Sequence, residues 1–409
     1  MFSKNTTACV GLFALASAGA IPATAEESGM WDLNNASLDI RYRAEFVDQD
    51  GIDERALGNT IRTRVGYNLR LPSSFSVYSD VENIRVIGSD DFNSTSNGQG
   101  QFPVVADPED TELNQAYLAW SGIEGTVVKY GRQRINLDNQ RFIGAVAWRQ
   151  NEQTFDGFSV KSKIGENVNV FAAHLTNTNR IFGDSHPNPA LADLNITAEV
   201  VNVAWDVGNV TVIPYAYLVE FDANAAASNA TTGVRVKGKT ALNNGGGDAN
   251  KIGVNYIVEY AQQGDYRDGV STIDHEYIHG EVSLAVSKVN FKAGHEKLGS
   301  NGGVSAFSMP LSTLHKFNGW ADLFLATPAN GLRDSYVSVG SKLAGFKVAA
   351  IYHDFSADVG DADYGTEIDF IATRKFGKNY SFLFKYANYS AQDFGTDRSR
   401  AWLQLGAKF

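Results

Sequence analysis

An alternation of apolar and polar residues with period two runs through most of the chain and limits its fold more than any other feature. Residues 38–46 read LDIRYRAEF, in which every second residue is apolar and the residues between them are charged. The pattern returns in residues 61–70 and 252–260. Successive side chains of a β-strand point to opposite faces, so each segment is a strand with one apolar and one polar face. No sustained helical stripe competes with it.

A soluble β-sandwich would alternate in the same way, with its apolar face turned inward, but strand length and turn rhythm argue against it. The segments run to about ten to fourteen residues, longer than the usual ~5–6 and suited to the ~9–11 tilted residues that cross a membrane. Tight turns such as 71–74 and 122–125 alternate with long polar stretches such as 88–110, 177–195 and 299–331. Short periplasmic turns and long external loops give this rhythm in outer-membrane barrels.

The N-terminus has the features of an export signal. An apolar stretch covers residues 9–21, and Ala23, Thr24 and Ala25 supply a small-x-small cleavage pattern. We expect residues 1–25 to be a removed signal peptide and residues 26–409 to form a single barrel domain. The lone Cys9 lies in the removed part, so no disulfide is expected in the mature chain.

Composition excludes two other classes of protein. The mean hydropathy of −0.22 excludes a bundle of membrane helices. The net charge of −11 makes nucleic acid an unsuitable partner. Abundant aromatic residues and scarce proline suit a barrel whose apolar side chains form an outer band.

Counting the segments predicts an all-β fold, a transmembrane antiparallel up-and-down β-barrel of about 18 strands, with long external loops of which some fold inward. A barrel of 16–18 strands leaves an aqueous lumen. The strands are expected to begin near residues 36, 57, 73, 110, 126, 153, 167, 195, 210, 231, 250, 273, 289, 332, 346, 363, 379 and 400. The weakest of these predictions cover residues 231–239 and the surroundings of Tyr117.

If apolar positions face lipid, the residues between them line the pore. Ionised groups are costly in hydrocarbon but not against water, so their number implies a wet interior. Asp39, His279 and Glu296 are expected on the lumen face. The principal candidates are Arg41, Arg43, Glu45, Arg62, Arg64, Lys251, Glu259, Glu281, Lys292, Lys342, Lys347, Glu367, Asp369 and Lys385. Bracing of the wall by Arg–Glu and Lys–Glu pairs is an alternative role for the same residues.

The segment 130–156 is distinctive because it combines arginines with an apolar stretch in a connection that is not rich in Gly or Ser. We predict that it folds inward and narrows the channel. Its candidate constriction residues are Arg132, Arg134, Arg141, Trp148 and Arg149. Guanidinium groups would attract carboxylates, sulfates or phosphates there. The alternative is that these arginines bind lipopolysaccharide phosphates at the rim.

Several motifs resemble those of a known family. They are GRQ at 131–133, NQRFIG at 139–144, WRQNEQTFD at 148–156, FNGWAD at 317–322, TPANGL at 327–332 and KYANY at 385–389. Together they are similar to the alginate-export family of outer-membrane porins. That resemblance implies an eighteen-stranded monomeric barrel with a charged lumen. This chain mixes Asp and Glu among the basic lumen residues, whereas the member that exports an acidic polysaccharide has a strongly arginine-lined pore.

Two patterns imitate metal sites. His275 to His279 reads HEYIH, which matches the metalloprotease pattern, but two histidines four residues apart on a strand lie roughly 13 Å apart and cannot share one zinc. The acidic run 358–363 lacks the Glu of an EF-hand loop. A weak calcium site there is an open alternative. We expect neither a metal nor a cofactor, and no enzymatic activity.

The sequence therefore predicts a bacterial outer-membrane channel for passive transport of hydrophilic solutes, with anions favoured: small organic acids, sugars or acidic saccharides. Export of an acidic polysaccharide such as alginate is the first alternative, and a structural or adhesive barrel is the second. The expected partners are membrane lipid, lipopolysaccharide and the solutes. The closing strand ending at Phe409 is expected to engage the barrel-assembly machinery, and the barrel is expected to be a monomer.

Overall fold

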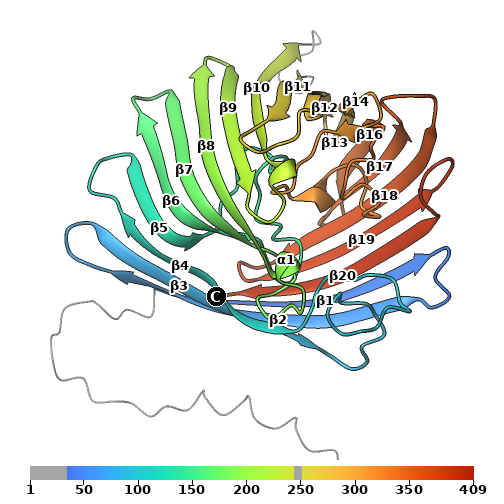
Figure 1. The fold of residues 1–409 in the computed structure, drawn as a ribbon, viewed down its shortest axis with the longest axis horizontal. Coiled ribbons are helices and arrows are strands. Elements are labelled where there is room, and N and C mark those ends of the chain that lie inside the picture. Colours follow the sequence, from blue (N-terminus) through green and yellow to red (C-terminus); the bar gives the residue numbers. More distant parts are fainter. Residues whose placement is uncertain (1–34, 244–250) are drawn as a thin grey trace, which may run out of the picture.

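A single closed antiparallel sheet forms the molecule. A computed structural model describes residues 35–243 and 251–409, and the expected signal peptide lies outside these residues. The sheet has 18 strands, each paired with its sequence neighbours, and β1 (Ala36–Gln49) pairs with both β2 (Ala56–Arg70) and β20 (Arg398–Lys408), which closes the barrel. Figure 1 shows the strands curving around a centre into which long loops fold; the short helix α1 (Pro189–Ala192) lies in the connection from β7 to β8.

The remaining wall strands follow in chain order. They are β3 (Phe75–Val86), β4 (Asp110–Trp120), β5 (Thr126–Gln133), β6 (Thr154–Ile164), β7 (Val168–Asn179), β8 (Asp193–Val207), β9 (Val210–Phe221), β10 (Asn229–Asn243), β11 (Lys251–Asp265), β12 (Asp274–Val286), β13 (Val289–Leu298), β16 (Leu332–Leu343), β17 (Phe346–Ser356), β18 (Asp363–Phe376) and β19 (Tyr380–Ser390). The short pair β14 (Ser300–Asn301) and β15 (Ser305–Ala306) and the 3-10 turns η2 (Ala225–Ala227) and η4 (Leu314–Lys316) lie in loops.

The predicted barrel is confirmed, including its strand count. Every wall strand begins within two residues of its predicted position. The uncertain stretch 231–239 lies in β10, which pairs with β9 and β11, and Tyr117 lies in β4. Within the described residues no helix is long and apolar enough to cross a membrane.

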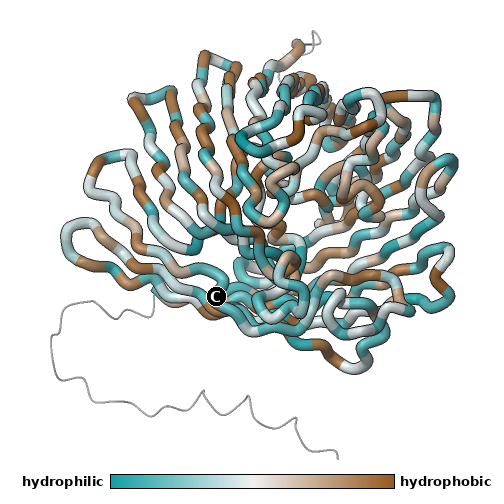
Figure 2. Tube along the Cα trace, viewed as in Figure 1, coloured by the Kyte–Doolittle hydropathy of each residue, from teal (hydrophilic) through white to brown (hydrophobic). Residues whose placement is uncertain are grey.

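The two faces of each strand differ as the alternation predicts. In β2, Leu57 and Val65 are exposed on the outer wall, whereas Thr60, Arg62 and Arg64 are buried inside. Figure 2 shows hydrophilic and hydrophobic residues alternating along the strands. Tight turns join the strands at one end of the barrel, where β1 begins and β20 ends. Long connections leave from the other end, so in an outer-membrane barrel the tight turns are periplasmic and the long loops external.

One part of the lumen face is apolar, which the sequence did not predict. On β8 and β9 the inward positions include Ile196, Val200 and Ile213, all nearly inaccessible to water. Ile196 and Val200 belong to one buried cluster with Leu137 and Ile143 from the connection between β5 and β6. The apolar residues inside the barrel therefore serve as a surface on which this connection packs.

Candidate functional site

Three long connections enter the barrel and determine how much of the lumen stays open. The first, 87–109, joins β3 to β4 and places Asp107 against Arg43 of β1. The second, 134–153, joins β5 to β6, as predicted from its sequence. The third, 299–331, joins β13 to β16 and contacts the second loop, for example through the Gly144 N–H, which donates to the Leu311 carbonyl at 2.9 Å. We call these loops 1, 2 and 3.

The predicted arginines of β1 and β2 do lie on the lumen face, but they are bound to acids or to loop 2. Arg62 pairs with Asp39 at 2.8 Å. Arg64 pairs with Glu82 of β3 and, at 3.2 Å, with Glu152 of loop 2. Arg41 has no carboxylate partner among the described residues; it donates to the Gln150 side chain at 2.9 Å and to loop carbonyls.

Arg149 lies at the centre of the largest buried ionic network. Its guanidinium is 2.9 Å from Glu45 Oε2 and 3.0 Å from Asp322 Oδ2, which belongs to loop 3. Arg400 of β20 approaches the same two carboxylates, at 2.8 Å from Glu45 and 3.3 Å from Asp322. Burial alone would raise the pKa of Asp107 in loop 1, but Arg43 and Arg149 outweigh burial and hold that pKa below its ordinary value. The network therefore joins all three loops to the wall.

Arg141 anchors the tip of loop 2 on the opposite wall. Its Nε and Nη2 atoms donate to the two oxygens of Glu296 of β13 at 2.8 and 2.9 Å. Nη2 also donates to Asn318 of loop 3 at 2.7 Å. A planar guanidinium bound through both arms is held in orientation as well as position. Arg134, at the root of loop 2, pairs with Glu152 and remains about one-third exposed.

An open cavity of about 330 Å³ separates loop 3 from the wall formed by β10 to β17. Lys316, Phe317 and Trp320 line its loop side. The wall side carries ionisable groups that mostly have partners: Arg235 pairs with Glu259 at 2.7 Å and Lys292 with Glu281 at 2.9 Å. Loops fill the side of the lumen next to β1 and β2, and this cavity lies on the other side. We call it the eyelet.

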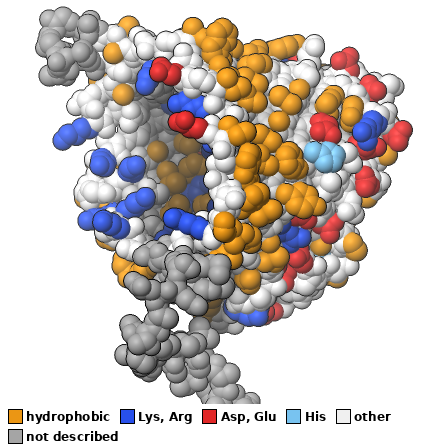
Figure 3. Space-filling model, turned by 90° about the vertical axis from the view of Figure 1, so that its left-hand side faces the viewer, with side chains coloured by type: hydrophobic (Ala, Val, Ile, Leu, Met, Phe, Trp, Pro, Cys, Tyr) orange, Lys and Arg blue, Asp and Glu red, His pale blue; other side chains and the backbone are white. Residues whose placement is uncertain are grey.

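Lysines without acidic partners line the lumen between the eyelet and the tight turns. Lys342 and Lys347 are directly opposite each other in the β16–β17 pair and share the faces of Asp334 and His353, which point inward. Both are exposed, and neither has an ion-pair partner in the part of the chain that the structure describes. By the same alternation Lys161, Lys163, Lys237, Lys239 and Lys375 also face the lumen. We call this region the lysine vestibule; Figure 3 shows Lys and Arg bordering a hollow in the molecule.

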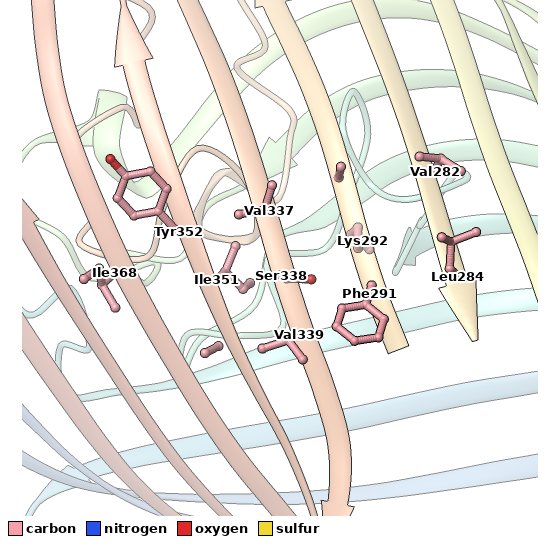
Figure 4. Close-up of a pocket in the computed structure, with 12 residues that line it drawn as sticks. Val282, Leu284, Phe291, Lys292, Val337, Ser338, Val339, Ile351, Tyr352 and Ile368 are labelled. Carbon is pink, nitrogen blue, oxygen red and sulfur yellow. The ribbon is translucent and has the colours of Figure 1, made fainter. Parts of the chain in front are cut away.

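The outer wall is apolar, as a lipid-facing surface requires. Figure 3 shows a band of hydrophobic side chains beside the hollow. Figure 4 shows a depression in this outer wall between β12 and β18, lined by Phe291, Val337, Val339, Tyr352 and Ile368. Its lining is almost wholly apolar, so it suits acyl chains and not a hydrophilic solute.

Arg132 differs from its predicted position. It is the penultimate residue of β5, and its side chain is on the outer face with Tyr130, where it pairs with Asp156 at 3.0 Å and Asp184 at 3.4 Å. The reason is strand parity, because Gln133 and Lys129 take the lumen side of β5. Through these ion pairs Arg132 stabilises the wall near the external rim, and its side chain does not enter the constriction.

The other predicted lumen residues lie where the alternation places them. Glu367, Asp369 and Lys385 are buried on the inner face of β18 and β19, and Trp148 of loop 2 packs near them. The side chain of Lys251 lies outside the described residues. His275 and His279 lie on the extended β12, where His275 contacts Ser305 and His279 contacts Tyr336. No group of three or more His, Cys, Asp or Glu in the described ranges could hold a metal.

Sequence reasoning missed several ionic partners. Asp107 and Asp322 lie in loops, where no periodicity marks a buried position. Arg235 and Arg400 lie on strands and share the faces of predicted lumen residues, so the same alternation could have identified them. His353, which lies 2.8 Å from Asp334, could have been identified from the same alternation.

Comparison with known proteins agrees with this architecture. The model of the family described as "Alginate export" matches residues 33–274, more than half of the chain. Among solved structures, OccAB2 of Acinetobacter baumannii matches with a TM-score of 0.69 at 13% identity, over 92% of this chain and 98% of that chain. OccK9 (OpdG) of Pseudomonas aeruginosa matches with a TM-score of 0.69 at 12% identity, over 91% and 98%. OpdK of Pseudomonas aeruginosa, with vanillate, matches with a TM-score of 0.68 at 13% identity, over 92% and 99%.

A search of curated proteins gave no match. The structural matches establish a shared barrel fold, and the family model, which matches the sequence itself, identifies the family. The chain is an outer-membrane β-barrel and belongs to the alginate-export family.

Proposed function

We propose that this barrel is a passive channel for small hydrophilic anions. The observation that carries the proposal is the contrast between its two sets of cations. Most arginines near the loops are buried against carboxylates, whereas the vestibule lysines are exposed on the lumen face without acidic partners. Free positive charge therefore lies along the water-filled part of the route.

The vestibule would favour anions by raising their local concentration. Two unit charges interact by roughly 1 kcal/mol at 4 Å in bulk water and more beside a low-dielectric wall. Several such lysines, such as Lys342 and Lys347, act together on an entering anion and repel cations. In the eyelet Lys316 is the loop cation without a carboxylate partner among the described residues; its ammonium donates to the Asn139 carbonyl at 2.9 Å. Positive charge therefore extends from the vestibule into the eyelet, which we infer is the narrow part of the route.

The comparisons support a solute of this class. The family is named for export of alginate, an acidic polysaccharide. The OpdK structure contains vanillate, which carries a carboxylate. Both solutes are anionic, although they differ greatly in size.

Planar-bilayer recording of the purified protein tests the proposal. Under a KCl gradient, we expect stable conductance and a reversal potential displaced toward that of chloride. The double variant Lys342→Gln/Lys347→Gln should reduce this displacement. Lys297→Gln is the matched control because it removes a lysine from the outer face, where Lys297 pairs with Glu276. Absence of conductance, or preference for potassium, would refute the proposal.

A second candidate is export of an acidic polysaccharide, which the family match favours. A polymer must thread the eyelet, whereas a small acid only has to fit it. Swelling of proteoliposomes in oligouronates of increasing length separates the two functions. We expect entry of the monomer and a sharp loss with length; equal entry of long oligomers would favour the exporter.

A further inference from the structure

One buried lysine has an unusual environment. Lys385 of β19 points into the barrel and is 4% exposed. Its ammonium lies 3.7 Å from the centre of the Trp320 ring and 4.4 Å from that of Trp148. No carboxylate of the described residues lies within ion-pair distance of it, since no salt bridge includes Lys385. Aromatic rings attract a cation through their electron-rich faces, and the carboxylates of Asp369 and Asp322 add their charge from beyond that distance.

The ammonium also reaches a histidine. Lys385 Nζ donates to His315 Nε2 at 2.7 Å, and His315 Nδ1 donates to Asp322 Oδ1 at 2.6 Å. This arrangement requires a neutral imidazole. Consistent with it, burial lowers the pKa of His315 in loop 3 to about 3, although Asp322 opposes the shift. The Trp148 ring stacks on His315, with centroids 4.4 Å apart and planes at 9°.

The groups around Lys385 come from segments far apart in the sequence. Trp148 belongs to loop 2, whereas His315 and Trp320 belong to loop 3. Trp402 of β20 closes the arrangement from the wall, with its ring 5.4 Å from the ammonium. The Lys385 side chain thus contacts loop 2, loop 3 and the barrel wall. Trp320 in addition lines the eyelet, so its position affects the width of the eyelet.

We propose that Lys385 is the positioning residue that clasps loops 2 and 3 to the wall and thereby sets the size limit of the eyelet. This inference rests on the proposed channel function. Other groups face the same cluster: Arg149 and Arg400 hold Asp322, and Glu367 of β18 accepts the N–H of Ala321 at 2.8 Å. These contacts fix one end of the loop 3 segment. Beyond these contacts, the ammonium binds the Nε2 atom of His315 and lies over the Trp320 ring.

The test is the exclusion size of single channels, measured with neutral polyethylene glycols of graded mass. Lys385→Ala should raise unit conductance and admit larger polymers. Lys347→Ala is the matched control: it removes a lysine from the same lumen but from the vestibule, so it should change ion selectivity without changing the size limit.

Chemical rescue separates a positioning role from loss of packing. Propylammonium matches the atoms removed in Lys385→Ala and can restore the cation between the rings. It should return the size limit to the wild-type value, whereas 1-propanol, of similar shape but neutral, should not. Equal restoration by propanol would show cavity filling and overturn the proposal, as would an unchanged size limit in a folded Lys385→Ala barrel.

A second variant, in a loop, tests the proposal if Lys385→Ala does not fold. Trp148→Ala removes one ring of the clasp without altering a strand and should also enlarge the passage; an unchanged limit would overturn the proposal. An absence of conductance in the wild-type protein would instead refute the channel function, so the two failures are distinguishable.

Discussion

The anchor of loop 2 gives a quantitative prediction. The Arg141 and Glu296 side chains are 1% and 5% exposed, and their two parallel hydrogen bonds form a buried ion pair. Arg141→Met leaves Glu296 with only the neutral donors Tyr277 and Asn318. Removing one partner of a buried pair typically costs about 3–5 kcal/mol, because the remaining charge is uncompensated. For Arg141→Met we expect a stability cost in the upper part of this range.

Arg149 provides a comparison, because it is a second buried arginine of loop 2 that pairs with carboxylates. Arg149→Met should cost less, near the lower end of the range of about 3–5 kcal/mol. Its acidic partners keep other cations: Glu45 keeps Arg400 at 2.8 Å, and Asp107 keeps Arg43 at 3.2 Å. Both substitutions remove the same guanidinium group. The difference between their costs in stability therefore measures the effect of a carboxylate that is left without a cation.

Amide hydrogen exchange of loop 2, followed by mass spectrometry in detergent micelles, measures the cost. A loss of 3–5 kcal/mol in opening free energy corresponds to roughly 100- to 5,000-fold faster exchange of protected amides. Arg141→Met/Glu296→Gln should recover most of the loss, because it removes the stranded charge. The reasoning fails if Arg149→Met opens the loop more readily than Arg141→Met, or if the double variant exchanges as fast as Arg141→Met.

Three further outcomes follow from the site. Lys342→Glu should move the reversal potential toward that of potassium further than neutralisation by Gln does, and an equal shift for both would contradict a charge effect. Arg132→Ala should leave selectivity unchanged and lower only the resistance of the barrel to heat in detergent, because its side chain is on the outer wall. The closed loop 3 should lose stability as pH falls from about 6.5 toward 3: His315 has its pKa lowered by burial, so in this window the open form binds a proton that the closed form does not. His315→Gln should flatten that pH dependence of hydrogen exchange.

Local periodicity carried the fold prediction. Every wall strand could be located from alternation and turn rhythm, because in a barrel each strand has one face toward lipid and one toward the lumen, whatever its neighbours are. The same rule placed Arg41, Arg62 and Lys385 inside. The same alternation also places Arg132 on the outer face, because Tyr130, two residues before it in β5, is exposed to lipid. The arginine-rich run that follows led us to assign Arg132 to the inward loop instead.

What the sequence determined by itself is therefore the barrel, its strands and the two faces of each strand, since these depend on spacing along the chain. Only the tertiary structure decided which charges are free. Arg149 meets Glu45, 104 positions away in the sequence, and Asp322, 173 positions away, and loop residues such as Asp107 carry no periodic mark of burial. Neutralisation depends on distance in space, so the cations that remain to attract a solute are known only once the loops have folded back into the barrel.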